Sequence, residues 1–511
     1  MSSRQPVAPA LVPTSSALAK NRLSTGMVVL FVISAIAPFV VQGGLVPTAL
    51  AVTGLTGVPI AFLVVAAILG IFSVGYVAMA RHVANAGAFY TYVARGLGKP
   101  FGVGAAWVAL LAYNPFQIGA AAAFGAIGAP LVDQWFNVSV PWWGLAFAAW
   151  AVVAVLGVRS IDVNGKVIAA LILAEITTIV IFSTAGLLDS GTAVTAAPLM
   201  PSRLFGAGAG ALGVLALTGF AGWEQSVVFS EEARDPKRTV PRATYLSLAV
   251  IAALYAFSSW AMIVASGAHV VARAQAEGPE LLFNLAGHSL GPVAVKIGHG
   301  LLLTSLFAAM LSFHNIIARY AFALGREGVL FRAFGRTSPR TGAPIYGSLA
   351  QSAFGFLVLL GYVLSGWDNP LVQLFYWGGS LGAIGVLLLI TATSFAVPVF
   401  FARANADEGP WRQYVAPTIA VVLLVGMTWL AMTNIDVLFG VAAGSTLTWA
   451  VPVGFAATAL GGVAWALFLR SARPAAYAAI GLGSEAATIP APPRHRVRVQ
   501  RAALPQDSSI R

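Results

Sequence analysis

Two acidic residues, Glu175 and Glu224, stand inside long apolar runs of the sequence. The residues that would share a helix face with Glu175 carry no charge: Leu171, Ile172, Thr178 and Ile179. A carboxyl group that loses its water without gaining a cation favours its neutral, protonated form. Glu175 is therefore a candidate coupling carboxylate that binds and releases a proton, and a structural hydrogen-bond anchor is the alternative. Glu224 is a candidate gating residue or an anchor for nearby backbone.

Glycine and proline interrupt two of these runs. The segment SAIAPFVVQGG carries Pro38, Gly43 and Gly44, and the segment LTGFAGWE carries Gly219 and Gly222. A helix that unwinds inside a bilayer leaves N–H and C=O groups unpaired, which is unfavourable unless these groups line a cavity or bind something. The N–H groups at a helix start suit a carboxylate, and free carbonyls suit an ammonium. The interruptions indicate a site for a small zwitterion, although glycine and proline are also common in ordinary membrane helices.

Further polar side chains lie in the third and eighth apolar runs. They are Tyr113, Asn114, Gln117, Ser305, Ser312 and His314. The first three could bind the side chain of a substrate or form hydrogen bonds between helices. The two serines could join a sodium site. The histidine could face the same site, because its pKa suits proton exchange, or it could be a packing residue.

A group of charged residues follows the sixth apolar run and continues after the eighth. It comprises Glu231, Glu232, Arg234, Arg238 and Arg326. Ion pairs among these residues could form a gate that opens and closes on one side of the membrane. A solvated cluster without such a role is the alternative, since exposed ion pairs contribute little to stability.

These residues need long elements to position them. A helix of roughly 20 apolar residues crosses a bilayer, and the sequence holds about twelve such runs. They cover residues 26–52, 58–80, 101–128, 142–158, 167–188, 206–230, 243–266, 295–324, 345–366, 371–401, 413–433 and 443–469. The two interrupted runs stand first in two successive sets of five, which is typical of an inverted-repeat transporter. Segment 84–100 predicts an amphipathic interfacial helix, and 280–286 a short surface helix.

The basic residues indicate the orientation of the chain. Of the 29 Lys and Arg residues, all but Arg203, Arg273 and Lys296 fall in alternate connecting segments, at the adjoining end of an apolar run, as Arg319 does, or in the two tails. Lys and Arg are enriched in cytoplasmic loops. Both termini are therefore expected in the cytoplasm, with the protein in the bacterial cytoplasmic membrane. Residues 1–24 and 471–511 are expected to be disordered cytoplasmic tails that flank a transmembrane domain at 25–470.

The composition excludes several classes of protein. Of the 511 residues, 59% are hydrophobic and 9% are charged, whereas a soluble domain is about one quarter charged. The net charge of +12 follows the loops, so we expect no nucleic-acid partner. The chain has no Cys, only six His, and no HExxH or GxSxG pattern, so we expect no enzyme activity, no metal and no cofactor.

Three segments resemble the amino acid–polyamine–organocation permease family. The segment GFAGWEQSVVFSEEARDPKRTVPRA (219–243) is similar to the family's sixth helix and the loop that follows it. FHNIIARYAFALGREGVLFRAFGRTSPRTGAP (313–344) resembles the eighth helix with its basic loop, and GYVAMARHVANAGAFYTYVARGLG (75–98) the second helix with its interfacial helix. The resemblance covers about residues 25–470. The family's Gly-Ser-Gly break in the first helix is absent, and Ala-Pro-Phe-Val-Val-Gln stands there instead.

The resemblance implies an all-α, five-plus-five inverted-repeat fold of the leucine-transporter type, with discontinuous helices 1 and 6 and a midplane site. It implies that a substrate carboxylate meets N–H groups at Val40, Val41 and Gln42. The ammonium would meet carbonyls near Ala37 and near Thr218–Ala221. The other residues placed at the site are Pro38, Gly219 and Phe220. In the family, a side chain like Phe220 covers the substrate, and ordinary packing is the alternative for it.

We expect a secondary carrier for an amino acid or a related amine, coupled to protons, that works by alternating access. Exchange without ion coupling is the first alternative, and a membrane sensor built on a transporter fold is another. The expected partners are the small-molecule substrate, the proton and the lipid bilayer. The identity of the substrate and the oligomeric state stay open.

Overall fold

The computed structural model describes residues 18, 21–83, 85–159, 161–404 and 406–483, with only the backbone described for 161–168. Within these residues the regular structure is helical, apart from one bridge pairing between Leu23 and Ala233. Ten helices of the described chain are long and apolar enough to cross a membrane. The prediction of an all-α integral membrane fold is confirmed, whereas the count of twelve spans and the inverted repeat stay predictions.

The long helices outside the two interrupted runs coincide with predicted runs. This set includes the shorter α7 and leaves out the first run, so it differs from the ten spans counted above. They are α4 (Val58–Ala80), α6 (Lys99–Phe136), α7 (Trp142–Gly157), α8 (Ile161–Asp189), α10 (Pro236–Ser266), α12 (Glu280–Arg326), α13 (Ile345–Leu364), α14 (Trp377–Arg403), α15 (Ala416–Thr433) and α17 (Thr446–Ala472). At 16 residues, α7 is shorter than the others. The shorter helices are α5 (Phe89–Gly96), α11 (Val270–Glu277), α16 (Ile435–Phe439) and α18 (Pro474–Ala479). The predicted surface helix 280–286 is the first part of α12, which bends at Gly291.

The first predicted run is divided at a single residue. Helix α1 (Thr25–Ile36) ends at Ala37, whose φ of 54° and ψ of 71° are left-handed, and α2 (Pro38–Val40) begins directly after it. A π-helical turn at 41–45 then leads into α3 (Val46–Thr53). Proline disfavours helical backbone at the preceding residue and suits the first position of a new helix. The Ala37–Pro38 pair therefore explains why the helix stops and restarts here.

The sixth predicted run is also divided. Helix α9 (Ala209–Thr218) is followed by turns and then by a 3-10 helix at Trp223–Val227. Gly222 between them has a φ of 107°, and a Cβ added there would lie 2.9 Å from the Cβ of Ala35. Glycine tolerates this backbone conformation and the close approach. The two interruptions are therefore in direct contact with each other.

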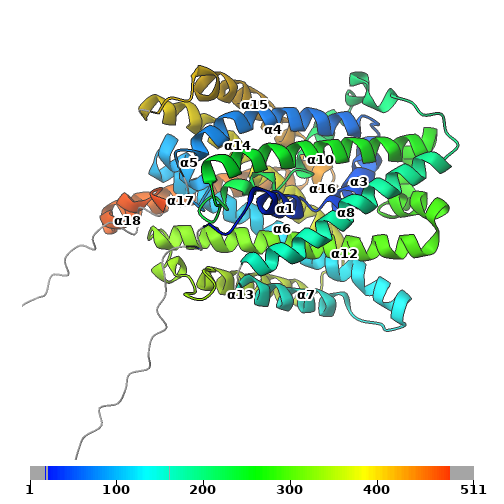
Figure 1. Ribbon diagram of the computed structural model, residues 1–511, viewed down its shortest axis with the longest axis horizontal. Helices are drawn as coiled ribbons and strands as arrows, with labels where there is room; N and C mark the ends of the chain where they lie inside the picture. Colours follow the sequence, from blue (N-terminus) through cyan, green and yellow to red (C-terminus); the bar gives the residue numbers. More distant parts are fainter. Residues whose placement is uncertain (1–17, 19–20, 84, 160, 405, 484–511) are drawn as a thin grey trace, which may run out of the picture.

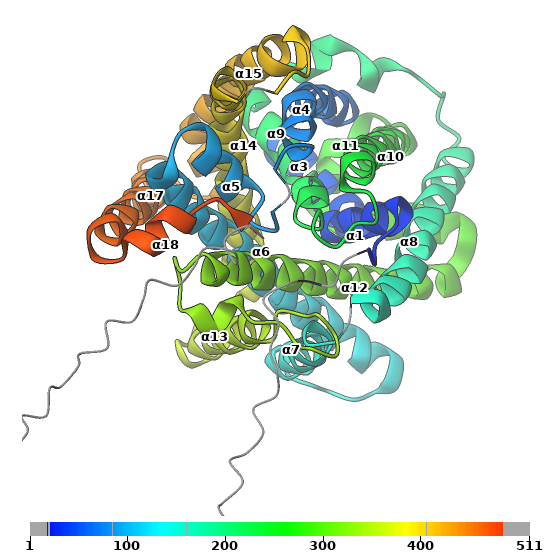
Figure 2. The same ribbon diagram turned by 60° about the vertical axis from the view of Figure 1, so that its left-hand side comes forward.

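Long helices surround the two interrupted segments. Figure 1 shows α4, α10 and α12 running lengthwise through the molecule. In the view of Figure 2, α1, α3 and α9 lie between α4 and α10 on one side and α6 and α12 on the other. Helix α1 contacts α8, α10 and α12, and α9 contacts α4, α14 and α15. The interruptions therefore lie in the middle of the bundle.

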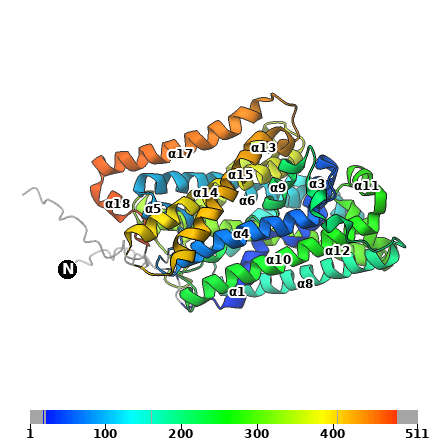
Figure 3. The same cartoon turned by 90° about the horizontal axis from the view of Figure 1, so that it is seen from above.

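The bundle has two distinguishable ends. Helices α5 and α18 lie at one end, and α3 and α11 lie at the opposite end (Figure 3). We call these the α18 end and the α11 end. The helix predicted within 84–100 is α5, and its residues are mostly buried against α6 and α14 rather than spread on a surface. The predicted carboxyl-terminal tail, 471–511, begins with ordered residues, since α18 lies within it.

Candidate functional site

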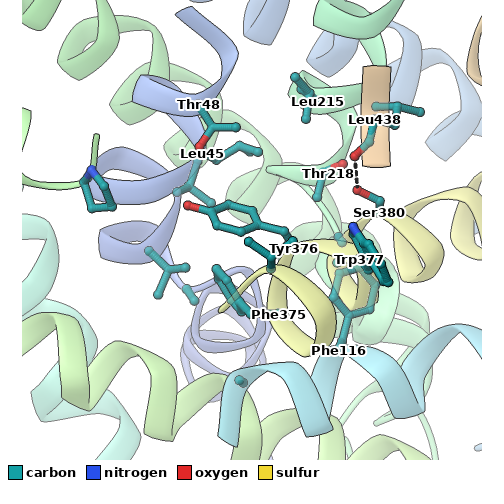
Figure 4. A pocket seen from close by; sticks show the side chains of 18 of the residues that line it. Leu45, Thr48, Phe116, Leu215, Thr218, Phe375, Tyr376, Trp377, Ser380 and Leu438 are labelled. Carbon is teal, nitrogen blue, oxygen red and sulfur yellow. Dashed lines mark hydrogen bonds between the residues drawn. The ribbon is translucent and has the colours of Figure 1, made fainter. Parts of the chain in front are cut away.

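A cavity of about 470 Å³ lies at the two helix interruptions. Its wall is built by the first run, by α9 and the turn after it, by α6, α12 and the start of α14, and by α16. It extends from the interruptions toward the α11 end, where Thr48, Gly278 and Pro279 line it. Figure 4 shows Tyr376, Phe375 and Thr218 around this space.

Five of the predicted substrate-binding residues line the cavity. They are Ala37, Val40, Val41, Thr218 and Ala221. The carbonyl of Ala37 already accepts a hydrogen bond from the N–H of Val41 at 3.2 Å, and that of Thr218 accepts one from Ala221 at 3.0 Å. A carbonyl oxygen has two lone pairs, so each retains the capacity for a second donor. Residues of both interruptions thus line one space.

The remaining predicted residues of the interruptions lie next to this wall rather than in it. Pro38, Gln42, Gly219 and Phe220 are absent from the described lining. Phe220 is fully buried, with its ring 6.1 Å from that of Phe62 and 5.9 Å from that of Tyr255. These contacts match the packing alternative for Phe220. Gln42 is also fully buried, and its amide has no hydrogen-bond partner among the described residues.

Glu175 connects α8 to α12 and to the first interruption. Its side chain is fully buried, and Ser305 donates a hydrogen bond of 2.7 Å to its Oε2. The backbone of Phe39, at the start of α2, also interacts with this carboxyl group. Its Oε1 has no hydrogen-bond partner among the described residues. A change in the charge of this group would therefore act directly on the backbone of the interruption.

Glu224 is held by hydrogen bonds from three elements. Tyr113 on α6 donates to its carboxylate at 2.8 Å, and the N–H of Gly222 donates at 3.0 Å. Its backbone carbonyl accepts a hydrogen bond of 3.0 Å from Tyr76 on α4. Glu224 thus fastens the sixth-run interruption to two long helices, as the anchoring interpretation expects.

The half-buried Asn114 and the buried Gln117 and His314 belong to a network outside the described cavity lining. Gln117 and His314 are hydrogen-bonded at 3.1 Å. The network continues to α13, where Ser348 lies 2.7 Å from the imidazole of His314. Gln351, also on α13, donates to the amide oxygens of Asn114 and Gln117. These contacts match the alternative in which the polar side chains form hydrogen bonds between helices instead of binding the substrate. The sequence offers no signal for the two α13 partners, because nothing in the chain indicates which helix packs beside His314.

Hydrogen bonds and ion pairs join the elements on the α18 side of the interruptions. The hydroxyls of Ser34 and Ser312 lie 2.6 Å apart, which joins α1 to α12. Beyond them, Arg319 forms two hydrogen bonds, at 2.7 and 3.0 Å, with Glu232. Arg326 pairs with Glu231 at 2.7 Å. All four side chains of these two pairs are at most 9% exposed.

The predicted gate residues fall into two groups. Glu231, Glu232 and Arg326 belong to the buried pairs. Outside these pairs, Arg238 pairs with Asp235 at 3.7 Å on the surface, and the backbone N–H of Arg234 donates to Leu23 at 3.0 Å. Arg319 was not among the predicted gate residues, although it is the buried partner of Glu232. Its position on a long apolar helix is a signal that could have singled it out, since a buried arginine almost always has a partner.

Comparison with known proteins places the chain among transporters. The amino acid permease family matches residues 23–456. A histidine permease of Lactococcus lactis subsp. cremoris is 26% identical over 55% of this chain and 61% of its own length. A lysine-specific permease of the same organism is 25% identical over 63% and 65%. An uncharacterized transporter of Mycobacterium tuberculosis is 32% identical over 45% and 49%. The matched regions thus span about half to two thirds of these relatives.

Proposed function

Because the chain belongs to the amino acid permease family, we propose that it carries an amino acid or a related amine across a cell membrane by alternating access. The one-sided cavity supports this proposal. The cavity starts at two interrupted helices and extends toward the α11 end, while the buried ion pairs lie at the α18 end. A carrier alternates between a state open to one side of the membrane and a state open to the other. A substrate shifts the balance between these states only by binding one of them better.

The proposed site holds the charged groups of the substrate at the two interruptions. The carboxylate would meet the N–H of Val40 at the start of α2, where the helix carries a partial positive charge. Pro38 has no N–H, the backbone of Phe39 interacts with Glu175, and the N–H of Val41 donates to Ala37. The ammonium would meet carbonyls of Ala37 and of the turn after α9. The distribution of basic residues supports a cytoplasmic α18 end and a twelve-helix topology.

Proton coupling through Glu175 is part of the proposal. Among the described residues no cation pairs with this buried carboxyl group, and a carboxyl group without water or a counter-ion favours its neutral form. Its contacts with Ser305 and with the backbone of Phe39 join α12 to the first interruption. Protonation would change both contacts, and this is how a proton could alter the substrate site.

Transport by the purified protein in proteoliposomes tests the proposal. Counterflow of a labelled amino acid mixture should show carrier activity, and an imposed inward pH gradient should drive accumulation. Glu175→Gln keeps the size of the side chain, so counterflow should persist while accumulation is lost. The control Glu280→Gln, at a carboxyl that is 54% exposed, should retain both. Gradient-driven accumulation in the Glu175→Gln protein would refute the coupling role, and an exchanger without ion coupling would then be the better description.

A further inference from the structure

The cavity wall beyond the backbone groups is built largely from aromatic rings. Phe116 on α6 and Phe313 on α12 stack with ring centroids 4.9 Å apart and an interplanar angle of 8°. Phe375 and Tyr376, in the π-helical turn before α14, and Trp377, its first residue, add a second set of rings to the lining. Figure 4 shows Tyr376 reaching across the space. Aromatic rings supply a large apolar surface of defined geometry. This part of the cavity is therefore suited to an apolar group of considerable size.

Several polar side chains in the lining already have partners. The indole N–H of Trp377 donates to the carbonyl of Phe439 at 2.9 Å, and Ser380 donates to the carbonyl of Leu438 at 2.9 Å. Thr218 donates to its own helix at 3.0 Å. Because these groups already donate hydrogen bonds to backbone carbonyls, they offer little to a polar substrate side chain.

No residue in the described lining carries a charge at neutral pH. The two buried carboxyl groups near the interruptions lie outside this lining and have partners of their own. Glu224 accepts from Tyr113 and Gly222, and Glu175 accepts from Ser305. A cationic side chain that entered the cavity would lose its water without gaining a counter-ion, which is strongly unfavourable.

The shape of the aromatic wall is fixed by close helix packing. Gly382 on α14 lies against the ring of Phe116, because a Cβ added there would come within 2.3 Å of it. Gly378 approaches the backbone of Pro115, with 2.9 Å between the added Cβ and the carbonyl oxygen. These contacts hold α14 against α6, so the ring of Phe116 has little room to move back and admit water around a charged group.

We propose that this site selects amino acids with a bulky, uncharged apolar or aromatic side chain and rejects those with a cationic side chain. The inference rests on the proposed carrier function and specifies the substrate class of the same cavity. The volume of about 470 Å³ falls within the range of small-molecule sites. The selectivity would separate this chain from relatives that are named as histidine and lysine-specific permeases.

Competition in counterflow tests the selectivity. L-Norleucine and L-lysine differ chiefly in the terminal ammonium group, so their ratio isolates the effect of charge. Norleucine, phenylalanine and tryptophan should compete, and norleucine should compete about a hundredfold more strongly than lysine. Equal or better competition by lysine overturns the substrate class but leaves the carrier function standing. A protein that neither binds nor exchanges any amino acid or amine overturns both.

A pair of variants at Ala309 provides a second test. This small residue on α12 lines the cavity, so Ala309→Asp would supply the missing counter-ion. The variant should shift the lysine-to-norleucine ratio toward lysine by roughly tenfold or more, whereas the uncharged control Ala309→Asn should not. Both variants should fold, as judged by their size-exclusion profiles. If they fold and neither shifts the lysine-to-norleucine ratio, the cavity wall does not discriminate side-chain charge and the proposal fails.

Discussion

Tyr113 and Glu224 meet in a region from which water is excluded, so each depends on the other for a hydrogen-bond partner. Tyr113→Phe removes the side-chain donor to a buried carboxyl group that also accepts from Gly222, and we expect a loss of stability of about 1–3 kcal/mol. Thermal unfolding in detergent should show it. Tyr255→Phe is the matched control, because the hydroxyl of this buried tyrosine has no hydrogen-bond partner among the described residues. A control that lost as much stability as Tyr113→Phe would contradict the anchoring role of the hydrogen bond.

The sequence predicted single residues better than it predicted their partners. Burial of Glu175 follows from its apolar surroundings, which are local. Its contact with Ser305 depends on how α8 and α12 pack, and no short-range pattern carries that information. His314 shows the same limit. Helical periodicity places it on a face, but the choice between the cavity and α13 depends on which neighbour that face meets.

At the scale of elements, glycine is required at Gly222 in the interruption after α9 but is only tolerated at Gly213 within α9. Gly222→Ala would place a side chain at a φ of 107° and within 2.9 Å of Ala35. We expect destabilisation of about 1–3 kcal/mol and reduced counterflow. Gly213→Ala, within α9, meets open space and should stabilise the protein by about 0.5–1 kcal/mol. Unfolding temperatures of the two variants should move in opposite directions, and a shift in the same direction would contradict the strain argument.

The place of each interruption could be predicted, but its form could not. Pro38 marks a stop because it lacks an N–H and restricts the residue before it. The sequence did not show that Ala37 would adopt the left-handed conformation, since this conformation is unfavourable for alanine and is imposed by the surrounding packing. The boundary of the predicted carboxyl-terminal tail illustrates the same point. The tail that contains α18 is rich in Ala, Pro and Arg, which predicted disorder, whereas α18 and the residues after it contact distant parts of the chain.

For the whole molecule, the Glu232–Arg319 pair connects α12 to the start of the chain. Glu232 follows the sixth run, and its carbonyl accepts hydrogen bonds from the N–H groups of Arg22 and Leu23. Glu232→Gln leaves a buried arginine without its counter-ion, which is strongly unfavourable. We expect the variant to open the α18 end more often.

The absence of cysteine from the sequence makes this opening measurable. Ser230→Cys places a thiol at a fully buried position beside the pair, and its labelling by an impermeant maleimide in inside-out vesicles reports access from the α18 end. Glu232→Gln should raise the labelling rate roughly tenfold. Asp235→Asn, at an exposed pair with Arg238, should leave the rate unchanged. Equal rates in all three backgrounds would mean that the buried pair does not hold this end closed.

The carboxyl-terminal segment is fastened to the same end of the molecule by Glu327. This residue follows α12, is 1% exposed, and accepts hydrogen bonds from the N–H groups of Gly481 at 2.7 Å and Gly483 at 2.8 Å. Asn85 donates to it at 3.0 Å, and the hydroxyl of Tyr90 donates as well. The carboxylate therefore joins α12, α5 and the segment that follows α18.

Burial raises the pKa of the Glu327 carboxyl above its ordinary value, although its four hydrogen-bond donors oppose the shift. Arg326 beside it is paired with Glu231 and does not serve as its counter-ion. With the folded pKa raised, the folded protein binds the proton more tightly than the unfolded chain does. This contribution to stability is present in acid and is lost as the pH rises through the folded pKa. Glu327→Gln removes the titration, so the unfolding temperature of the wild type relative to this variant should increase as the pH falls from alkaline to mildly acidic. A difference between wild type and Glu327→Gln that stays constant with pH would exclude Glu327 as the titrating group.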